Sequence, residues 1–510
     1  MDNRTAHTTR SSSFHDLCRR NWGTASTILA TFLACVVLLP LLGHKPLTNW
    51  DEGIYAEVSR EMLSLGLLVP HWNYQPWFEK PPLMLWITAA FFKIFGVNEF
   101  WARAGSALSG VAIVALLHGW LTSRKDTLAA WLSTFILLGT FGFLHVCRVG
   151  EMDVLLSLGC CVVLCGLTAV QDRRLSGWYL FWAGLAIALM TKGAASLVLI
   201  ITALLFAALE RWNATRLVRS FWLGLTLFLV AVLPWHFYML HRFCASFLTE
   251  YVGFHVMARA THQIEDHMTH WWYYLWVLLI SAAPFVLLYP FAIVDSFRRK
   301  ELRAWAIFAV VIVGLFTAVQ TRLPNYIAPA YPALAVLTSV FLADRLRQLQ
   351  RGRQQYFLSF WTIVIALAIF LCIASAFLTS GPRRKLHESK VSADVVFAEK
   401  ESIQLLRNVF SQPQPVPGPL LAWWEGNARS IATSVFYARR PVQQVQLQPL
   451  STGVPTDKYL FQPERLENAV RSEPRIILLD KSLILQIPIE FSYKQIATGR
   501  SMEVCIIERR

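Results

Sequence analysis

The stretch NWDEGIYAEVSREMLSLGLLVPHWNYQPWFEKPP, residues 49–82, follows the first long apolar run of the chain and is rich in charge. Acidic side chains are costly at the centre of a bilayer, so these residues belong at a membrane surface or in a wet cavity. Trp and Tyr accompany the charges, which is typical of an interfacial, partly buried segment. A solvated connecting loop is the alternative interpretation. The charged residues are Asp51, Glu52, Glu57, Arg60, Glu61, Glu79 and Lys80.

The composition of the whole chain indicates a polytopic membrane protein. Of its 510 residues, 55% are hydrophobic, which is more than an ordinary soluble protein carries. The formal net charge of +15 does not indicate nucleic-acid binding, because the basic residues sit in short loops between apolar runs. The nine cysteines lie mostly in apolar runs without metal-like spacing, so we interpret them as packing residues.

Apolar runs of spanning length predict eleven transmembrane helices. The run 83–97 is short and contains Lys93, so we place it in the interface. With eleven crossings, five basic loops fall on the side of the N-terminus, as the positive-inside bias requires. We therefore expect a cytoplasmic N-terminus (1–23) and a transmembrane domain (24–380) with an outer loop at 44–103. The predicted spans are 24–43, 104–121, 127–147, 153–170, 178–192, 194–209, 220–240, 272–293, 304–320, 325–343 and 356–379.

The character of the sequence changes after residue 380. Residues 381–418 are polar and end in a Pro-rich linker, and short alternating or β-branched stretches follow at 475–479 and 502–507. A helix is predicted within 426–438. We expect 381–510 to form a small α/β domain outside the membrane, with no catalytic constellation of its own.

Carboxylates and cations that can carry chemistry occur twice in the first outer loop. The adjacent Asp51 and Glu52 can take a proton from a nucleophilic hydroxyl or help to hold a divalent cation. Glu79 and Lys80 place a carboxylate beside an ammonium that can neutralise a phosphate, although a local salt bridge is the alternative. The loop therefore offers both a base and a phosphate contact.

Further polar groups lie where apolar runs meet on the predicted outer side. The segment from Arg148 to Asp153 joins two spans, with helix-end anchoring as the alternative role. Lys192 precedes Gly193 between two short runs and either meets a lipid phosphate or snorkels. Arg322 and Tyr326 begin the tenth span, where they can meet an anionic group. Since candidate chemistry and basic loops sort onto opposite faces, any active site should face outward.

Four histidines fall in the outer loop around 251–270, but their spacings of 7, 5 and 3 match no zinc signature closely. Taken together, the outward-facing residues combine two or three carboxylates with several scattered cations. A site for a phosphate-bearing lipid substrate needs that mixture.

These residues resemble a known family. Trp50 to Leu63, with Val69-Pro70-His71 and Phe78 to Pro81, looks like the first periplasmic loop of the bacterial aminoarabinose transferases of lipid A. Those enzymes are GT-C glycosyltransferases related to the protein O-mannosyltransferases. The likeness continues through Met152-Asp153, Met190 to Gly193, Arg259 to Tyr274 and Leu323 to Ile327, and it covers about 25 to 345.

The resemblance implies a helical GT-C membrane protein in the bacterial inner membrane with its active site facing the periplasm. It implies an inverting transfer of a sugar from an undecaprenyl-phosphate donor to lipid A, another glycan or a protein. Asp51 would orient or deprotonate the acceptor, and the other catalytic candidates are Glu52 and Asp153. Glu79 and His255, with His267 as the alternative histidine, would hold a divalent cation, zinc or magnesium. The residues expected to bind the donor phosphate or sugar are Arg60, Lys80, Lys192, Arg259 and Tyr326.

Two other functions are compatible with a polytopic chain. A transporter or lipid flippase usually places its charges near the midplane on broken helices within internal repeats. Here the charges gather at one face, and no paired half-repeat is visible. A silent lipid-binding protein would not need the carboxylates and Lys80 of the first loop. The glycosyltransferase is therefore the favoured interpretation.

Overall fold

The computed structural model describes residues 22–48, 51–210, 218–258, 270–349, 352–359, 393–410, 416, 418–423, 431–439, 442–446, 464–470, 473–499 and 502–509. Contacts within the chain divide it into two compact units. The first, here called the helical unit, comprises Met1–Leu42, Phe78–Ile87 and Arg103–Ser380. The second, the sheet unit, comprises Gly43–Trp77, Thr88–Ala102 and Gly381–Arg510.

The described part of the helical unit is built from apolar helices around one continuous core. Several are long and apolar enough to cross a membrane, and two further pairs are bent by 70° and 118° at short breaks. Helices lie within the predicted spans from 24–43 to 325–343, and most of 356–379 lies outside the described residues. By length and composition, five of the described helices could cross a membrane, or up to seven if each bent pair is one span, so the number of eleven crossings stays a prediction. The elements are the helix Trp22–Leu38, α4 (Glu99–Ser123), α5 (Thr127–Leu138), α6 (Phe141–Cys147), α7 (Asp153–Gln171), α8 (Ser176–Lys192), α9 (Leu197–Leu209), α10 (Val218–Leu248), η3 (Thr249–Ala258), α12 (Tyr273–Ser281), α13 (Tyr289–Phe297), α14 (Lys300–Ala318) and α15 (Ala330–Gln348).

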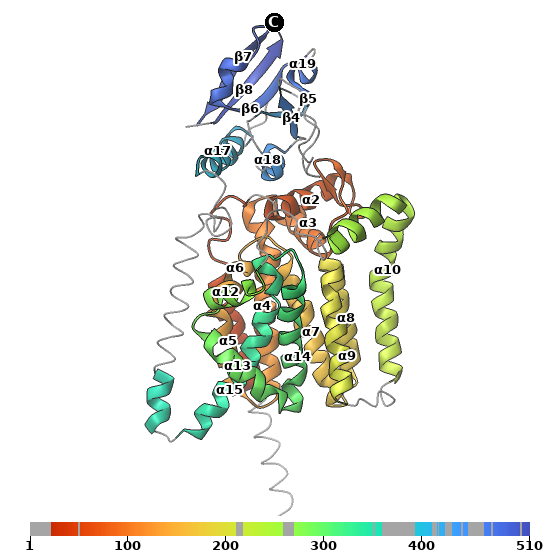
Figure 1. Ribbon diagram of the computed structural model, residues 1–510, viewed down its shortest axis with the longest axis vertical. Helices are drawn as coiled ribbons and strands as arrows, with labels where there is room; N and C mark the ends of the chain where they lie inside the picture. The colour runs from red at the N-terminus through yellow and green to blue at the C-terminus, as the bar shows by residue number, and fades with distance from the viewer. Residues whose placement is uncertain are drawn as a thin grey trace, which may run out of the picture. The chain divides into compact units, whose positions relative to one another are not determined.

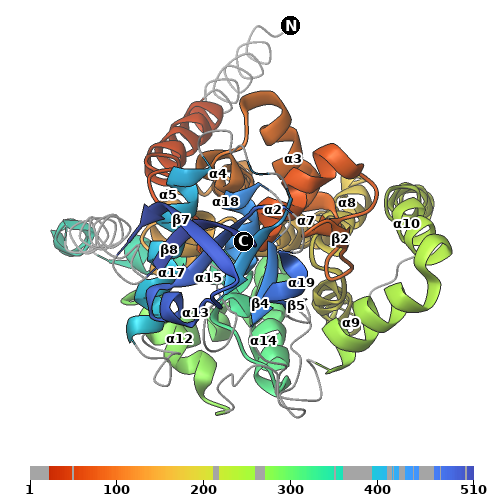
Figure 2. The same ribbon diagram turned by 90° about the horizontal axis from the view of Figure 1, so that it is seen from above.

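Helices α7 and α8 approach each other closely because glycines line their contact. A Cβ atom added to Gly184 would lie 2.6 Å from the carbonyl oxygen of Gly159, and one added to Gly166 would lie 2.6 Å from the amide nitrogen of Phe181. Small residues allow helix backbones to approach where lipid supplies no hydrophobic driving force. In Figure 2, α8 lies between α7 and α10, so both of its sides are packed.

Replacing Gly184 with Ala is expected to destabilise the protein by about 1–3 kcal/mol, because the new methyl group overlaps the backbone of α7. The melting temperature in detergent, followed by circular dichroism, measures this loss. Gly314→Ala is the matched control, since Gly314 is also helical but has no atom within 4 Å of the added methyl group. An equal loss in both variants would contradict the close-packing explanation.

The run from α8 to α9 turns back on itself at Gly193, whose φ is +50°. At the far end of α9, Glu210 pairs with Arg303 near the start of α14. At the near end of α8, the preceding Asp172 shares a cavity with Arg299 and Lys300, which lead into the same helix. Both ends of the run therefore lie beside the beginning of α14, and Lys192 stands at the opposite end.

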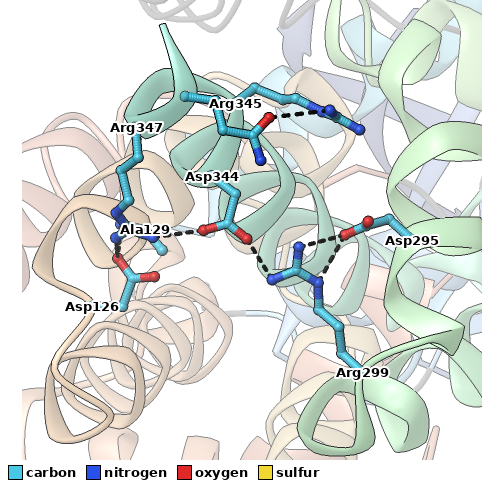
Figure 3. A network of polar contacts seen from close by, with 8 residues as sticks. Asp126, Ala129, Asp295, Arg299, Asp344, Arg345 and Arg347 are labelled. Atoms are coloured by element: carbon cyan, nitrogen blue, oxygen red, sulfur yellow. Dashed lines mark hydrogen bonds and ion pairs between the residues drawn. The ribbon is translucent and has the colours of Figure 1, made fainter.

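A network of ion pairs near the beginning of α14 joins α5, α13 and α15 (Figure 3). Arg299 pairs with Asp295 at 2.8 Å and with Asp344, and Arg347 pairs with Asp344 at 2.8 Å and with Asp126. Asp126 also caps α5 by accepting the amide of Ala129 at 2.9 Å. Two of the basic loops predicted to lie in the cytoplasm thus supply cations to a structural network.

The sheet unit contains a six-stranded sheet with the strand order β5-β4-β3-β6-β8-β7. The first four strands in that order are parallel, and β8 and β7 join antiparallel to their neighbours. The sheet is drawn in blue in Figure 1. The predicted stretches 475–479 and 502–507 fall in the neighbouring β6 and β8. The elements are β3 (Leu420–Trp423), β4 (Val442–Gln446), β5 (Glu464–Arg465), β6 (Arg475–Asp480), β7 (Phe491–Thr498), β8 (Met502–Arg509), α17 (Ala393–Val409), α18 (Ile431–Ala438) and α19 (Leu466–Ala469).

Residues Gly43–Trp77 of the first outer loop belong to the same unit as this sheet, whereas Phe78–Ile87 belong to the helical unit. The loop forms α2 (Asp51–Leu65), a hairpin of β1 (His71–Trp72) and β2 (Gln75–Pro76), and the short α3 (Leu83–Phe95), which begins in the helical unit and ends in the sheet unit. At the hairpin tip, Asn73 exchanges two hydrogen bonds with the backbone of Val442, at 3.0 and 2.9 Å. The amide of Leu47 donates to Tyr437 Oη at 2.8 Å. The loop expected within domain 24–380 therefore packs with residues of the domain expected at 381–510.

Candidate active site

In the helical unit, Asp153 and Lys192 form an ion pair where α7 begins and α8 ends. Lys192 Nζ donates to Asp153 Oδ1 at 2.6 Å, and the two side chains are only 16% and 6% exposed, respectively. A negatively charged side chain at a helix N-terminus and a positively charged side chain at a helix C-terminus both interact favourably with the helix dipole. Because α7 and α8 are adjacent and antiparallel, these two ends meet.

Tyr326 completes this group. Lys192 Nζ lies 5.3 Å from the centroid of the Tyr326 ring, within the range of a cation–π contact. The preceding Asn325 bonds the side chain of Glu151, whose backbone carbonyl accepts from Ser106 Oγ at 2.6 Å. The structure thus brings together three residues that the sequence predicted for the site: Asp153, Lys192 and Tyr326.

Two arginines that the sequence also singled out serve as helix caps. The guanidinium of Arg148 donates to the carbonyls of Leu38 and Pro40 at 2.9 and 2.8 Å, at the end of the first helix. Arg322 Nη2 donates to the carbonyl of Thr317 at 2.7 Å, at the end of α14. Basic side chains often satisfy the last carbonyls of a helix in this way. Helix-end anchoring is therefore a role that both arginines perform.

A row of aromatic side chains connects Gly193 to Phe78, the first residue of the segment Phe78–Ile87 of the helical unit. A Cβ atom on Gly193 would lie 2.4 Å from Tyr251 Oη, so that hydroxyl packs directly on the glycine backbone. Tyr251 stacks on Phe247 at 5.1 Å between centroids, and Phe247 meets Phe78 at 6.0 Å. Phe78 immediately precedes the buried Glu79 and the half-buried Lys80. The row places the Glu79-Lys80 segment two ring contacts away from Tyr251 at Gly193.

Sequence reasoning missed this row, although a signal for it exists. Phe243, Phe247 and Tyr251 recur every four residues, which puts them on one face of a helix. Phe78 also meets Phe243 at 4.8 Å. The period predicts a half-buried aromatic stripe on a helix, although in the structure the backbone is not helical at Cys244, between Phe243 and Phe247.

In the sheet unit, Asp51 and Glu52 begin α2 but have different surroundings. Asp51 is exposed at the first position of the helix. The Glu52 carboxylate is buried and accepts the amide and the hydroxyl of Thr48, at 2.6 and 3.0 Å. Of the two neighbouring carboxylates, Asp51 is thus the one exposed to a reactant, whereas Glu52 holds the entry to the helix.

Arg60, predicted to bind substrate, lies in a buried polar cluster on α2. Its guanidinium donates to both oxygens of Glu57, at 2.8 and 2.5 Å, and to Tyr74 Oη at 3.2 Å. Glu61, one turn beyond Glu57, accepts the amide of Tyr74 at 2.8 Å. Burial and the neighbouring charge of Glu57 raise the pKa of Glu61 well above its usual range.

This cluster makes stability depend on pH. Since the pKa of Glu61 is higher in the folded protein, folding takes up a proton above the unfolded-state value. The stabilisation is complete below that value and is lost as pH rises through the folded-state pKa. We expect the melting temperature to fall between about pH 5 and about pH 9, and Glu61→Gln to flatten that slope. Glu473→Gln changes an exposed carboxylate and should retain the slope; a slope unaltered in Glu61→Gln would contradict this assignment.

The remaining predicted residues concern the metal and one phosphate contact. Arg259 and His267 lie outside the described residues, and His255 falls in η3, where its side chain is not described. Among the described residues, no group of three His, Cys, Asp or Glu side chains is arranged to hold a metal ion. The described donors by themselves, Glu79 included, therefore do not make a metal site.

Comparisons with known proteins identify the fold. The sequence model of the family dolichyl-phosphate-mannose-protein mannosyltransferase matches residues 79–238. The crystal structure of ArnT from Cupriavidus metallidurans bound to undecaprenyl phosphate superposes with a TM-score of 0.70 at 20% identity, covering 95% of this chain and 98% of that one. The chain therefore has the fold of that helical membrane glycosyltransferase.

Two curated relatives have higher sequence identity. An undecaprenyl phosphate-alpha-4-amino-4-deoxy-L-arabinose arabinosyl transferase of Pseudomonas fluorescens is 30% identical over 421 residues, which are 78% of this chain and 68% of that protein. The enzyme of that name from Erwinia tasmaniensis is 29% identical over 61% of this chain and 58% of its own length. The chain belongs to the family of undecaprenyl phosphate-aminoarabinose arabinosyl transferases, a family of lipid-carrier-dependent glycosyltransferases.

Proposed function

We propose that the protein transfers a sugar, a 4-amino-4-deoxy-arabinose or a close analogue, from undecaprenyl phosphate to lipid A or a related acceptor. The single observation that carries this proposal at the site is the buried Asp153–Lys192 pair beside Tyr326. It holds a positively charged ammonium at the end of apolar helices, where a lipid phosphate can reach it. The relatives from Pseudomonas fluorescens and Erwinia tasmaniensis are named for the carrier undecaprenyl phosphate.

In the proposed reaction, the acceptor oxygen attacks the anomeric carbon as the bond from that carbon to the phosphate oxygen breaks. Undecaprenyl phosphate departs with the bonding electron pair, and the configuration at the anomeric carbon inverts. Lys192 and Lys80 stabilise the charge that grows on the departing phosphate, which is the main electrostatic task. Asp51 accepts the acceptor's proton. Asp153 fixes the position of Lys192, and Tyr326 and Arg259 contact the carrier or its sugar.

The orientation in the membrane is also part of the proposal. The chain would cross the inner membrane eleven times with its N-terminus in the cytoplasm, so that Asp153 and Lys192 face the periplasm. The positive-inside bias of the loops supports this arrangement, and so does the gathering of Arg299 and Arg347 at the other end of the helices. The short α3, with 13 residues, would lie in the interface without crossing.

A divalent cation bound by Glu79 with His255 or His267 remains a separate proposal. A carboxylate and an imidazole are suitable ligands for zinc, and a bound cation would supply further charge next to a phosphate. Since the described donors alone do not form a site, no step of the reaction above depends on it.

Mass spectrometry of lipid A and of undecaprenyl-phosphate sugars, with the gene present, deleted or restored as Asp51→Asn, tests the function. Loss of a pentosamine from lipid A on deletion, restored by the wild type alone, would establish both donor and acceptor. Unchanged lipid A with accumulated polyprenyl sugar would keep the transferase and replace the acceptor by another glycan or a protein. If neither pool changes, the proposed transfer is wrong and a transporter is the better interpretation.

A further inference from the structure

A cavity of about 360 Å³ opens between α4, α7 and α8, within the size range of small-ligand sites. Its walls come from apolar residues of all three helices, including Leu116, Ala169 and Leu180. Its rim comes from the turns that follow α4 and α7 and carries Arg124, Asp172 and Arg174. An apolar slot that ends in a charged rim has the polarity of a lipid tail and headgroup.

This cavity lies far from the proposed donor site. Asp153 is the first residue of α7 and Asp172 directly follows its last, so 19 residues separate the two sites. At 1.5 Å per residue, that distance is roughly 28 Å, about the thickness of the hydrocarbon core of a bilayer. A ligand in the cavity is therefore distinct from the sugar donor at Lys192. In the proposed orientation the cavity faces the cytoplasmic leaflet.

The rim has an excess of positive charge. Arg124 pairs with Asp172 at 2.6 Å, and its guanidinium lies 4.7 Å from the Trp120 ring centroid. Arg174 adds a second guanidinium, so two cations face one carboxylate. Ser176, the first residue of α8, adds a hydroxyl and the positive end of a 17-residue helix. One further negative charge would balance the rim.

We propose that this cavity binds an anionic glycerophospholipid, with its phosphodiester at Arg124, Arg174 and Ser176 and one acyl chain against Leu116 and Leu180. A phosphodiester carries one negative charge and acceptor oxygens that match guanidinium donors. A zwitterionic lipid adds a cationic headgroup that the rim does not balance. The rim and the apolar slot together thus select a lipid over a free anion.

Such a lipid would also support the packing of the unit. A second cavity of about 440 Å³ shares Trp120, Arg124 and Asp172 with the first and continues to Arg299 and Asp344 of the ion-pair network. The bound headgroup would therefore hold Arg124 beside the network that joins α5, α13 and α15. We expect the lipid to raise the melting temperature of the protein by mass action.

Native mass spectrometry of the full chain in detergent tests the proposal, with phosphatidylglycerol and phosphatidylcholine as probes. We expect phosphatidylglycerol to be retained in preference, and Arg174→Gln to weaken that retention by about tenfold, as for the loss of one charge-assisted hydrogen bond. Arg173→Gln is the matched control, because the adjacent Arg173 does not line the cavity. Both variants should keep the wild-type melting temperature without lipid.

Three outcomes would overturn the proposal. Equal retention of the two lipids would exclude selection by charge. An equal loss in Arg173→Gln would show diffuse attraction to a basic surface in place of a site. Full displacement by millimolar glycerol phosphate would show that the cavity binds an anion and makes no use of its apolar walls. None of these results depends on the transfer activity, so the lipid site and the proposed function can fail separately.

Discussion

Asp51→Asn is expected to lower turnover by about 1,000-fold while donor binding and expression stay close to those of the wild type. Asn keeps the shape of the side chain but cannot accept the acceptor's proton. Because Asp51 is exposed at the first position of α2, its loss removes only a favourable helix-dipole contact of about 0.3–1 kcal/mol. Turnover is measured with a purified undecaprenyl-phosphate sugar donor, and binding by competition with undecaprenyl phosphate.

The neighbouring Glu52 makes this experiment sharper. Its carboxylate holds Thr48, so Glu52→Gln should lower stability as well as activity. Glu473→Gln removes an exposed carboxylate of the same unit and should change neither. Normal turnover by Asp51→Asn would refute the role given to Asp51. A stable but inactive Glu52→Gln beside an active Asp51→Asn would instead transfer the role of base to Glu52.

The sequence singled out Asp153 and Lys192 because both residues interrupt apolar runs. Asp153 and Lys192 stand at the ends of segments that are otherwise hydrophobic, and polar residues at such places rarely lack a role. The same reasoning selected Arg148 and Arg322, whose guanidinium groups cap helix ends. Residue type and position are alike in the four cases. Only the partner of each side chain distinguishes the Asp153–Lys192 ion pair from the two helix caps, and sequence does not show partners.

The packing of the first loop with the C-terminal residues could not be predicted for a related reason. The contact between Asn73 and Val442 joins residues 369 positions apart through one side chain, which leaves no periodic pattern. By contrast, β6 and β8 could be located, because a run of apolar residues marks a buried strand. Local periodicity thus identifies elements, whereas single long-range hydrogen bonds decide which elements form a unit.

Breaking the Asp153–Lys192 pair is expected to have the second large effect. Removing one member leaves a charge that is 6–16% exposed without its partner, and such losses destabilise proteins by about 3–5 kcal/mol. Both Asp153→Asn and Lys192→Met should therefore lower the melting temperature strongly. The double variant Asp153→Asn/Lys192→Met leaves neither charge of the pair behind. Its loss of stability should therefore be smaller than the sum of the two single losses by about 1–3 kcal/mol.

Binding of undecaprenyl phosphate separates the structural role of this pair from its role toward the donor. Asp153→Asn keeps the ammonium of Lys192 and removes a competing carboxylate, so phosphate affinity should be retained or increased although stability falls. Lys192→Met removes the donor of charge-assisted hydrogen bonds and should lower affinity by about tenfold or more. Arg322→Met, which removes a cap on α14, is the control for lost positive charge and should leave affinity unchanged. If the two members of the pair lose affinity and stability in parallel, Lys192 serves only to hold α7 against α8, and the donor phosphate must bind elsewhere.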